Sequence, residues 1–259
     1  MNKITTITPL IISYNEEKNI KKTIAALKVF KKIILFDQYS SDNTTNIAKK
    51  FKNLKVIQVT KEEITKKYNK ILNSKFIKTD WVILLSADHI LTKAFVDEIK
   101  TLNFNDITSC EYKFDYIIYK KKIKSIYPPV NYFFNRRFYK FFNKGHSVEI
   151  KSKIKNFIHK EYKFKNRILH DDKKKIGFFI NSQLNYAKQQ LFFFQKNKKK
   201  RYIDKLRFNF VIIPFFIFFY CYFIKLSFLG GKRGLFYSYQ RLLYEIIFQL
   251  NKIDSQFKK

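Results

Sequence analysis

Short apolar runs and helical apolar stripes alternate along the first hundred residues of the chain. Apolar runs typical of buried strands occupy residues 10–12, 32–37, 55–59 and 81–85. Between them, apolar side chains recur at helical spacing, first at Ile20, Ile24 and Leu27 and later at Ile64, Tyr68, Ile71 and Leu72. This alternation predicts right-handed crossovers and a mostly parallel sheet with helices on both faces, as in a Rossmann-like α/β domain.

Polar groups follow three of these predicted strands. They are the sequences SYNEE after the first strand, DQYSSDNT after the second and SADH after the fourth. Ligands of parallel sheets bind beyond the carboxyl ends of the strands. We therefore expect these three groups to meet along one edge of the sheet.

The pattern changes after Leu102. Residues 110–129 are typical of antiparallel strands around a lysine-rich turn, and RILHDD at 167–172 ends a further strand. A helix is predicted next, because Ile176, Phe179, Ile180, Leu184, Ala187 and Leu191 share one helical face.

The C-terminal part contains two apolar stretches. Residues 210–224 carry no charge, but they are shorter than the roughly 20 residues that a helix needs to span a bilayer. Residues 235–250 place Leu242, Leu243, Ile246, Ile247 and Leu250 in helical register, with Arg241 and Glu245 on the opposite face. With basic flanks, these stretches predict an anchor on an anionic leaflet; the alternative is a helical hairpin that packs on the protein or on a second subunit.

Composition narrows the class of protein. A hydrophobic fraction of 46% with 19% aromatic residues fills a large core, which excludes a disordered basic tail. The net charge of +33 favours an anionic partner, yet Lys, Ile, Asn and Phe share A/T-rich codons, so solvated surface explains the excess equally well. Cys110 and Cys221 form no Cys-x-x-Cys pair, and the first residues lack a signal-peptide pattern, so we expect a cytoplasmic protein.

Carboxylates, not glycines, carry the candidate chemistry. A G-x-G-x-x-G fingerprint and a P-loop are both missing from the sequence, which has only 5 glycines. Asp37, Asp42 and Asp88 follow predicted strands, and Asp42 is typical of a helix cap. A strand-end carboxylate that holds Mg²⁺ or Mn²⁺ is the other common way to bind a diphosphate, so Asp88 is the candidate metal ligand.

Four motifs in this order resemble the nucleotide-binding half of family 2 glycosyltransferases. They are PLIISYNEEKNI, LFDQYSSDNT, KYNKIL and DWVILLSADHIL. Later blocks, YPPVNYFFNRR, KGHS and HDDKKKIGFFINSQLNYA, resemble a bacterial subgroup with Tyr-Pro-Pro, Gly-His and His-Asp-Asp-x-Lys blocks. The resemblance implies a GT-A fold over residues 1–195, with a nucleotide-sugar-binding half at 1–102 and an acceptor half at 103–195. The apolar stretches and basic flanks described above predict a basic, hydrophobic, membrane-associated helical region at 196–259.

The resemblance also assigns roles to individual residues. It implies that the donor is bound by Ser13, Tyr14, Glu16, Asp37, Asn69, Ser86 and Asp88. Asp88 coordinates a divalent cation, Mn²⁺ or Mg²⁺, and His170 is a further candidate ligand. This sequence departs from the family pattern at Ser86, which replaces the first Asp of Asp-x-Asp and is a poorer ligand, so the resemblance alone does not establish metal dependence.

An inverting transfer needs a general base near the acceptor hydroxyl. The candidates are Asp171, which is favoured, then Glu149, with Asp172 as a further possibility; His146 is a candidate contact to the donor sugar or acceptor. Structural roles stay open for some of these residues. His170 and Asp171 also suit a helix cap. Arg136 and Arg137 suit either a phosphate clamp or the solvated surface.

The sequence thus predicts a hexosyltransferase of cell-envelope polysaccharide synthesis, peripheral to the inner face of the membrane. It would use a nucleotide-diphosphate sugar and a lipid-linked or envelope glycan acceptor, without nucleic acid as a partner. The alternatives are a weak or inactive nucleotide-sugar-binding homologue and a basic nucleic-acid-binding protein, for which YFFNRRFYKFF at 132–142 is the candidate platform.

Overall fold

The computed structural model describes residues 3–60, 62–124, 126–173, 175–196, 202–209 and 212–258. The chain forms two compact units. The first contains residues 1–117, 127–142 and 149–173, and the second contains residues 118–126, 143–148 and 174–259. The helix that follows residue 175 therefore belongs with the C-terminal helices, whereas the sequence pattern places it with the α/β domain.

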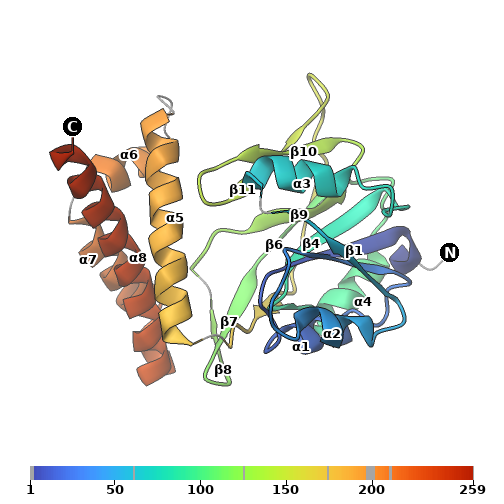
Figure 1. The fold of residues 1–259 in the computed structure, drawn as a ribbon, viewed down its shortest axis with the longest axis horizontal. Helices are drawn as coiled ribbons and strands as arrows, with labels where there is room; N and C mark the ends of the chain where they lie inside the picture. Colours follow the sequence, from blue (N-terminus) through green and yellow to red (C-terminus); the bar gives the residue numbers. More distant parts are fainter. Residues whose placement is uncertain are drawn as a thin grey trace. The chain divides into compact units, whose positions relative to one another are not determined.

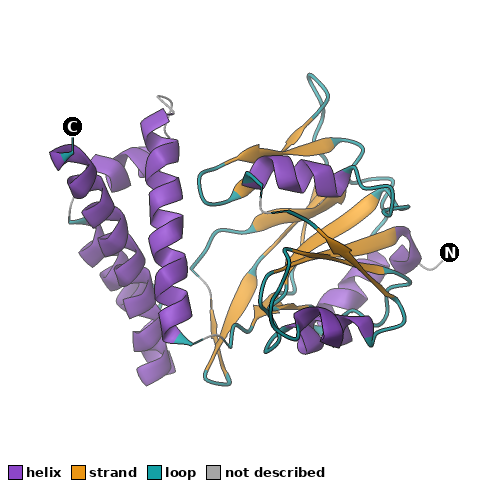
Figure 2. Ribbon diagram, in the orientation of Figure 1, coloured by secondary structure: helices purple, strands orange, loops and turns teal. Residues whose placement is uncertain are grey.

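A seven-stranded mixed sheet forms the centre of the first unit (Figure 2). Its strand order is β12-β6-β9-β4-β1-β2-β3. All neighbouring pairs are parallel except those of β9, which runs antiparallel to β4 and β6. The mostly parallel sheet predicted from the alternating pattern is thus present. Its strands are β1 (Ile7–Ser13), β2 (Ile33–Asp37), β3 (Leu54–Gln58), β4 (Trp81–Ser86), β6 (Ser109–Tyr112), β9 (Val130–Asn135) and β12 (Glu161–Lys163).

Helices and a hairpin cover the faces of this sheet. Alternate residues of the central strands, such as Ile11 and Ile83, share a core with Ile24 and Phe95 of the helices on one face. On another side of the sheet, the ring of Phe134 contacts Phe141 of the hairpin. The elements concerned are η1 (Lys3–Thr6), α1 (Ile20–Ala26), α2 (Thr44–Lys49), α3 (Ile64–Leu72), α4 (Lys93–Thr101), β10 (Tyr139–Asn143) and β11 (Val148–Ser152).

A second, small ladder brings distant parts of the first unit together. β13 (Ile168–His170) pairs antiparallel with β5 (His89–Ile90) and parallel with β7 (Phe114–Ile118). Its register sets His170 opposite His89. β13, which leads into Asp171 and Asp172, therefore lies beside the residues that follow β4.

The second unit is mainly helical (Figure 1). Its elements are β8 (Lys121–Lys124), α5 (Ile176–Lys196), α6 (Tyr202–Asn209), α7 (Ile213–Phe219), the π-helix η2 (Tyr220–Ile224), η3 (Ser227–Gly230) and α8 (Lys232–Phe257). Ala187, Leu191 and Phe194 of α5 pack against Tyr244 and Phe248 of α8.

Two expectations about these helices need correction. Only the C-terminal half of the expected apolar face of α5 is buried, and Ile176, at the start of that face, is 51% exposed. Glu245, expected on a polar face of α8, is instead buried. Its Oε1 lies 2.9 Å from Nη2 of Arg207 on α6, which is its counter-ion. A charge is tolerated inside a protein when it is paired in this way.

Among the residues that the structure describes, no helix is both long enough and apolar enough to cross a membrane. The basic segment 197–201 and the first two residues of the uncharged stretch, 210–211, lie outside the described residues.

Candidate functional site

The side chain of Asp37 is completely buried at the end of β2. Ser13, at the end of β1, donates a hydrogen bond from Oγ to Oδ1 of Asp37 at 2.7 Å. The backbone N–H of Ser40 donates to Oδ2 at 2.8 Å, and the Ser40 hydroxyl donates to Oδ1. Asp37 therefore fixes the loop after β2 to the end of β1, and a direct contact between Asp37 and a donor stays a prediction.

Further hydrogen bonds join the loop after β1 to the loop after β2. The N–H of Asn15, a residue with a left-handed φ of 54°, donates to Oγ of Ser40 at 2.9 Å. The N–H of Glu16 donates to Oγ1 of Thr44 at 2.7 Å. The two sequence motifs are thus two halves of one rigid surface at the carboxyl edge of the sheet, which Tyr14 shares as a half-buried residue.

Asp88 lies in a cluster with two histidines, two residues beyond the end of β4. Nε2 of His170 lies 2.9 Å from Oδ2 of Asp88, and Nε2 of His89 lies 3.9 Å from Oδ1. The ladder between β5 and β13 produces this arrangement, because it sets the two histidines opposite each other. The ring of Tyr116 on β7 covers His170, with 4.5 Å between ring centroids.

His89 is a neutral support for this cluster. Burial lowers its pKa to about 4, despite the opposing charge of Asp88. Its Nδ1 is 3.2 Å from the backbone N–H of Ser86, from which it accepts a hydrogen bond. A neutral imidazole has one unprotonated nitrogen, so Nε2 of His89 carries the proton, at 3.9 Å from Oδ1 of Asp88.

His170 differs from His89 in its electrostatic setting. Burial alone would lower its pKa, but the charge of Asp88 and the hydrogen bond to it, with Asp172 and Glu16, raise the pKa above its usual value. Of the two histidines in this cluster, His170 is therefore the one whose positively charged form is stabilised by the neighbouring carboxylates.

The chemistry of these groups fits a divalent cation. The ligand atoms of Asp88, His89 and His170 all lie within 4.8 Å of one another. A carboxylate oxygen and an imidazole nitrogen suit Mn²⁺, whereas Mg²⁺ prefers oxygen alone. Because Nδ1 of His89 is already used by Ser86, Asp88 and His170 are the two residues placed to hold the ion. Ser86 is exposed at the end of β4, and its role in donor binding stays a prediction.

The favoured base, Asp171, is next to the same cluster. Its N–H donates to the carbonyl oxygen of Asp88 at 2.9 Å. Its carboxylate is 2.7 Å from Nζ of Lys22 on α1 and is mostly buried. Asp172 is more exposed and accepts a hydrogen bond from Asn19 at 3.3 Å. Both carboxylates thus belong to the edge that carries Asp88.

The sequence of the chain matches the model of glycosyl transferase family 2 over residues 9–220. The chain belongs to this family. Two curated relatives, the SPbeta prophage-derived glycosyltransferase SunS of Bacillus subtilis (strain 168) and the glycosyltransferase SunS of Bacillus phage SPbeta, are each 35% identical over 91 residues. The match covers 34% of this chain and 21% of either relative, so the chain spans about a fifth of their length.

Solved structures of glycosyltransferases share the fold. A mannosyltransferase from Pyrobaculum calidifontis, in complex with GDP-Man and Mn²⁺, gives a TM-score of 0.55 at 10% identity, covering 96% of this chain and 87% of that one. S. aureus TarS 1-349 in complex with UDP-GlcNAc gives 0.50 at 12% identity, covering 96% and 92%. These similarities establish a GT-A-like α/β fold for this family 2 chain.

Three other residues with expected family roles are placed by their own contacts. Asn69 uses both ends of its amide on the backbone of Phe141, with distances of 2.8 and 2.9 Å, so it holds β10 against α3. Glu149 on β11 forms an ion pair with Lys151 at 2.7 Å. His146 belongs to the second unit. Their roles in binding or catalysis stay predictions.

A lysine on α3 that the sequence gives no reason to select lies beside the loop after β2. Nζ of Lys67 donates to Oε1 of Gln38 at 2.7 Å, and burial lowers the pKa of Lys67 below its ordinary value. Lys67 therefore links α3 to the loop after β2, a contact that only the tertiary fold brings about.

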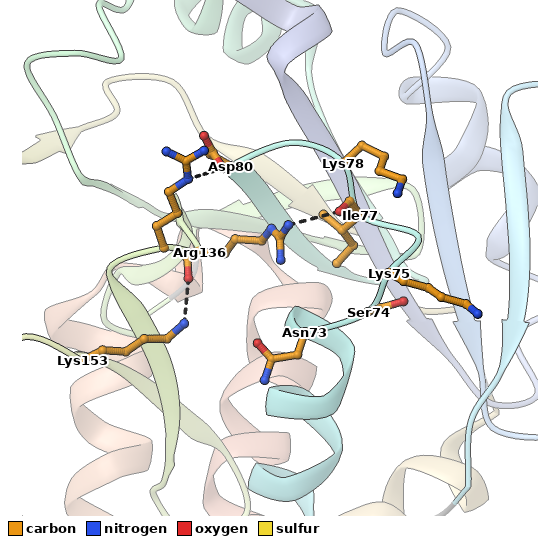
Figure 3. A pocket seen from close by; sticks show the side chains of 9 residues that line it. Asn73, Ser74, Lys75, Ile77, Lys78, Asp80, Arg136 and Lys153 are labelled. Carbon is orange, nitrogen blue, oxygen red and sulfur yellow. Dashed lines mark hydrogen bonds and ion pairs between the residues drawn. The ribbon is translucent and has the colours of Figure 1, made fainter.

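A separate hollow of about 580 Å³ lies at the start of β4 (Figure 3). Six residues of β4, at about 3.3 Å each, separate its Asp80 from the strand end that leads to Asp88. Arg136 donates three hydrogen bonds to the carbonyl oxygens of Thr79, Leu72 and Ile77. Arg137 forms an ion pair with Asp80 at 2.6 Å. Both guanidinium groups therefore hold the connection between α3 and β4, in place of the phosphate clamp considered from the sequence.

Proposed function

We propose that this protein transfers a sugar from a nucleotide-diphosphate sugar to a hydroxyl group of a lipid-linked or cell-envelope glycan, with inversion at the anomeric carbon. One observation carries the proposal. Asp88, His170 and Asp171 lie together at the carboxyl edge of the sheet, next to the joined loops after β1 and β2. Ligands of open α/β sheets bind at this edge.

The donor would be held in two parts. Tyr14, Glu16 and the loop after Asp37 would contact the nucleoside, with Ser13 and Asn69 supporting this surface. Asp88 and His170 would hold a divalent cation, which neutralises the diphosphate and stabilises it as a leaving group. The fold shared with a mannosyltransferase bound to GDP-Man and Mn²⁺ supports Mn²⁺ as the ion.

Asp171 would act as the general base. Its backbone bond to Asp88 and its ion pair with Lys22 fix the position of the carboxylate. In the reaction it would take the proton of the acceptor hydroxyl as that oxygen attacks the anomeric carbon from the side opposite the diphosphate. Glu149 is the next candidate for the base, and His146 a candidate contact to donor or acceptor.

The acceptor and the location follow from the surface of the chain. A strongly basic protein with an apolar C-terminal segment suits an acceptor at an anionic membrane surface. We therefore propose peripheral association with the inner face of the cell membrane.

A thermal-shift screen with UDP, GDP and their sugars, with and without Mn²⁺, tests the donor site. Binding to the native state raises the melting temperature by mass action. We expect a shift that needs Mn²⁺ in the wild type and is lost in Asp88→Asn. Asp80→Asn is the matched control, because Asp80 lies at the other end of β4 and should leave the shift unchanged.

Transfer is then measured as release of the nucleoside diphosphate in the presence of an acceptor extract. A Mn²⁺-dependent shift without any transfer would favour the alternative of a binding homologue with little activity. The absence of any shift with every nucleotide and cation would overturn the proposal.

A further inference from the structure

The segment formed by α7, η2 and η3 exposes a continuous set of large apolar side chains. Phe215, Phe216, Phe219, Phe223, Ile224 and Leu229 are 67%, 61%, 54%, 46%, 61% and 69% exposed, respectively. Soluble proteins rarely expose so many neighbouring apolar groups, and patches of this kind mark an interaction surface.

The opposite side of this segment is fixed to α8. Pro214 and Cys221 are buried, and the ring of Phe218 lies 5.4 Å from that of Tyr239. At the turn between η3 and α8, a Cβ on Gly234 would lie 1.7 Å from the carbonyl oxygen of Ser227, so only glycine allows the close approach seen there. The segment is therefore a packed part of the fold whose outer face is apolar.

The charges around this face favour an anionic partner. The sequence from Lys205 to Tyr244 contains no Asp or Glu. Lys225, Lys232 and Arg233 are exposed and adjoin the apolar residues in the chain. Nε of Arg233 also donates to the carbonyl oxygen of Tyr119 at 3.1 Å. A second copy bound on the same face would bring these cations close to their equivalents, because a two-fold interface uses the same patch on both subunits. Anionic lipid headgroups would instead neutralise them.

The length of the segment decides how it meets a bilayer. From Ile213 to Ile224 the helix contains 12 residues (7 in α7 and 5 in η2), which at about 1.5 Å each extend only about 18 Å. The hydrocarbon core of a bilayer is about 30 Å thick. A helix of this length with exposed phenylalanines and flanking lysines is suited to lie in the plane of the interface.

We propose that the outer face of α7, η2 and η3 inserts in plane into an anionic lipid surface, with Lys225, Lys232 and Arg233 on the headgroups. This proposal rests on the membrane association proposed above and names the residues that would make the contact. It does not depend on the transfer reaction.

Vesicle flotation tests the proposal. The full chain is mixed with vesicles of phosphatidylcholine alone or of phosphatidylcholine with phosphatidylglycerol. We expect the wild type to float with the anionic vesicles and at least about tenfold less with the neutral ones. The variant Phe215→Ser/Phe216→Ser/Phe219→Ser should lose at least about tenfold in binding to anionic vesicles. The control Ile154→Ser/Ile158→Ser removes two exposed apolar side chains elsewhere and should bind as the wild type does.

A second measurement separates folding and donor binding from membrane binding. The triple serine variant should keep its melting temperature and its shift with nucleotide and Mn²⁺, because these side chains are largely exposed. The proposal is overturned if the wild type ignores anionic vesicles or if the triple variant floats unchanged. It is also overturned if light scattering shows a wild-type dimer that the triple variant dissociates, since a second copy would then cover the face.

Discussion

Nε2 of His170 lies 2.9 Å from Oδ2 of Asp88, although 82 residues separate them in the chain. The neighbouring His89 is held differently, since its Nδ1 accepts a hydrogen bond from the N–H of Ser86. Of the two histidines, only His170 therefore has a nitrogen that can replace its bond to Asp88 by a bond to a cation.

Replacing His170 should weaken cation binding more than replacing His89. We expect His170→Asn to lower the Mn²⁺ affinity of the complex with a nucleoside diphosphate by more than about 100-fold, because loss of an outer-shell partner alone costs about 10- to 100-fold. His89→Asn should stay within about 10- to 100-fold, because His89 supports the cluster through its bond to Ser86 and is not placed to hold the ion. Calorimetric titration of Mn²⁺ measures both. A larger loss for His89 would show that the histidines have been assigned the wrong way round.

Asp171 and Asp172 should differ in their effect on catalysis. With Asp171→Asn, we expect kcat to fall by about 10²- to 10⁴-fold, as for loss of a general base, while the thermal shift with the donor nucleotide persists. Asp172→Asn should cost much less, because Asp172 is exposed, whereas Asp171 is buried and its backbone is bonded to Asp88. Steady-state kinetics with the same acceptor compare them. If Asp172→Asn proves the more damaging change, the base is Asp172.

Gly145 should tolerate no side chain. Its φ is +87°, and a Cβ would lie 2.2 Å from Oε1 of Gln190, which is buried and bonded to His146. Gly145→Ala should therefore lower the free energy of unfolding by roughly 1–3 kcal/mol. Gly177→Ala is the control, because the space around Gly177 in α5 is open and alanine favours a helix. Urea denaturation compares the two, and equal midpoints would contradict the crowding at Gly145.

His146 should make the protein less stable in mild acid. Burial lowers its pKa below the usual value, the hydrogen bond to Gln190 opposes this, and Arg207 and Arg241 add to the lowering. The unfolded chain therefore takes up the proton first as the pH falls through about 6.5, so stability is full above this pH and is lost below it.

The expected slope from this one group is at most about 1.4 kcal/mol per pH unit. Urea denaturation at several pH values between about 7.5 and 5.5 measures it, and His146→Gln should flatten the dependence in this window. An unchanged slope in His146→Gln would assign the effect to other groups.

The sequence predicted the elements of the first unit well. The apolar runs at 32–37 and 81–85 are buried strands, and the groups that follow them meet at one edge of the sheet. This succeeded because strand period, helix period and the geometry of parallel sheets are local or nearly local properties. The same reasoning was less successful for α5 and α8, because an apolar stripe on a helix does not determine which other element packs against that stripe.

What the sequence determined by itself was the alternation of strands and helices, the set of strand-end carboxylates and the short, uncharged C-terminal segment. Only the tertiary structure decided which of these groups touch. The pairing of β5 with β13 sets His170 on Asp88, Ser13 and Ser40 enclose Asp37, and Arg207 makes a buried Glu245 tolerable. Each of these contacts forms because sheet register or helix packing brings two distant segments together. The periodicity of one segment predicts its own secondary structure, but it does not predict which segment will pack against it.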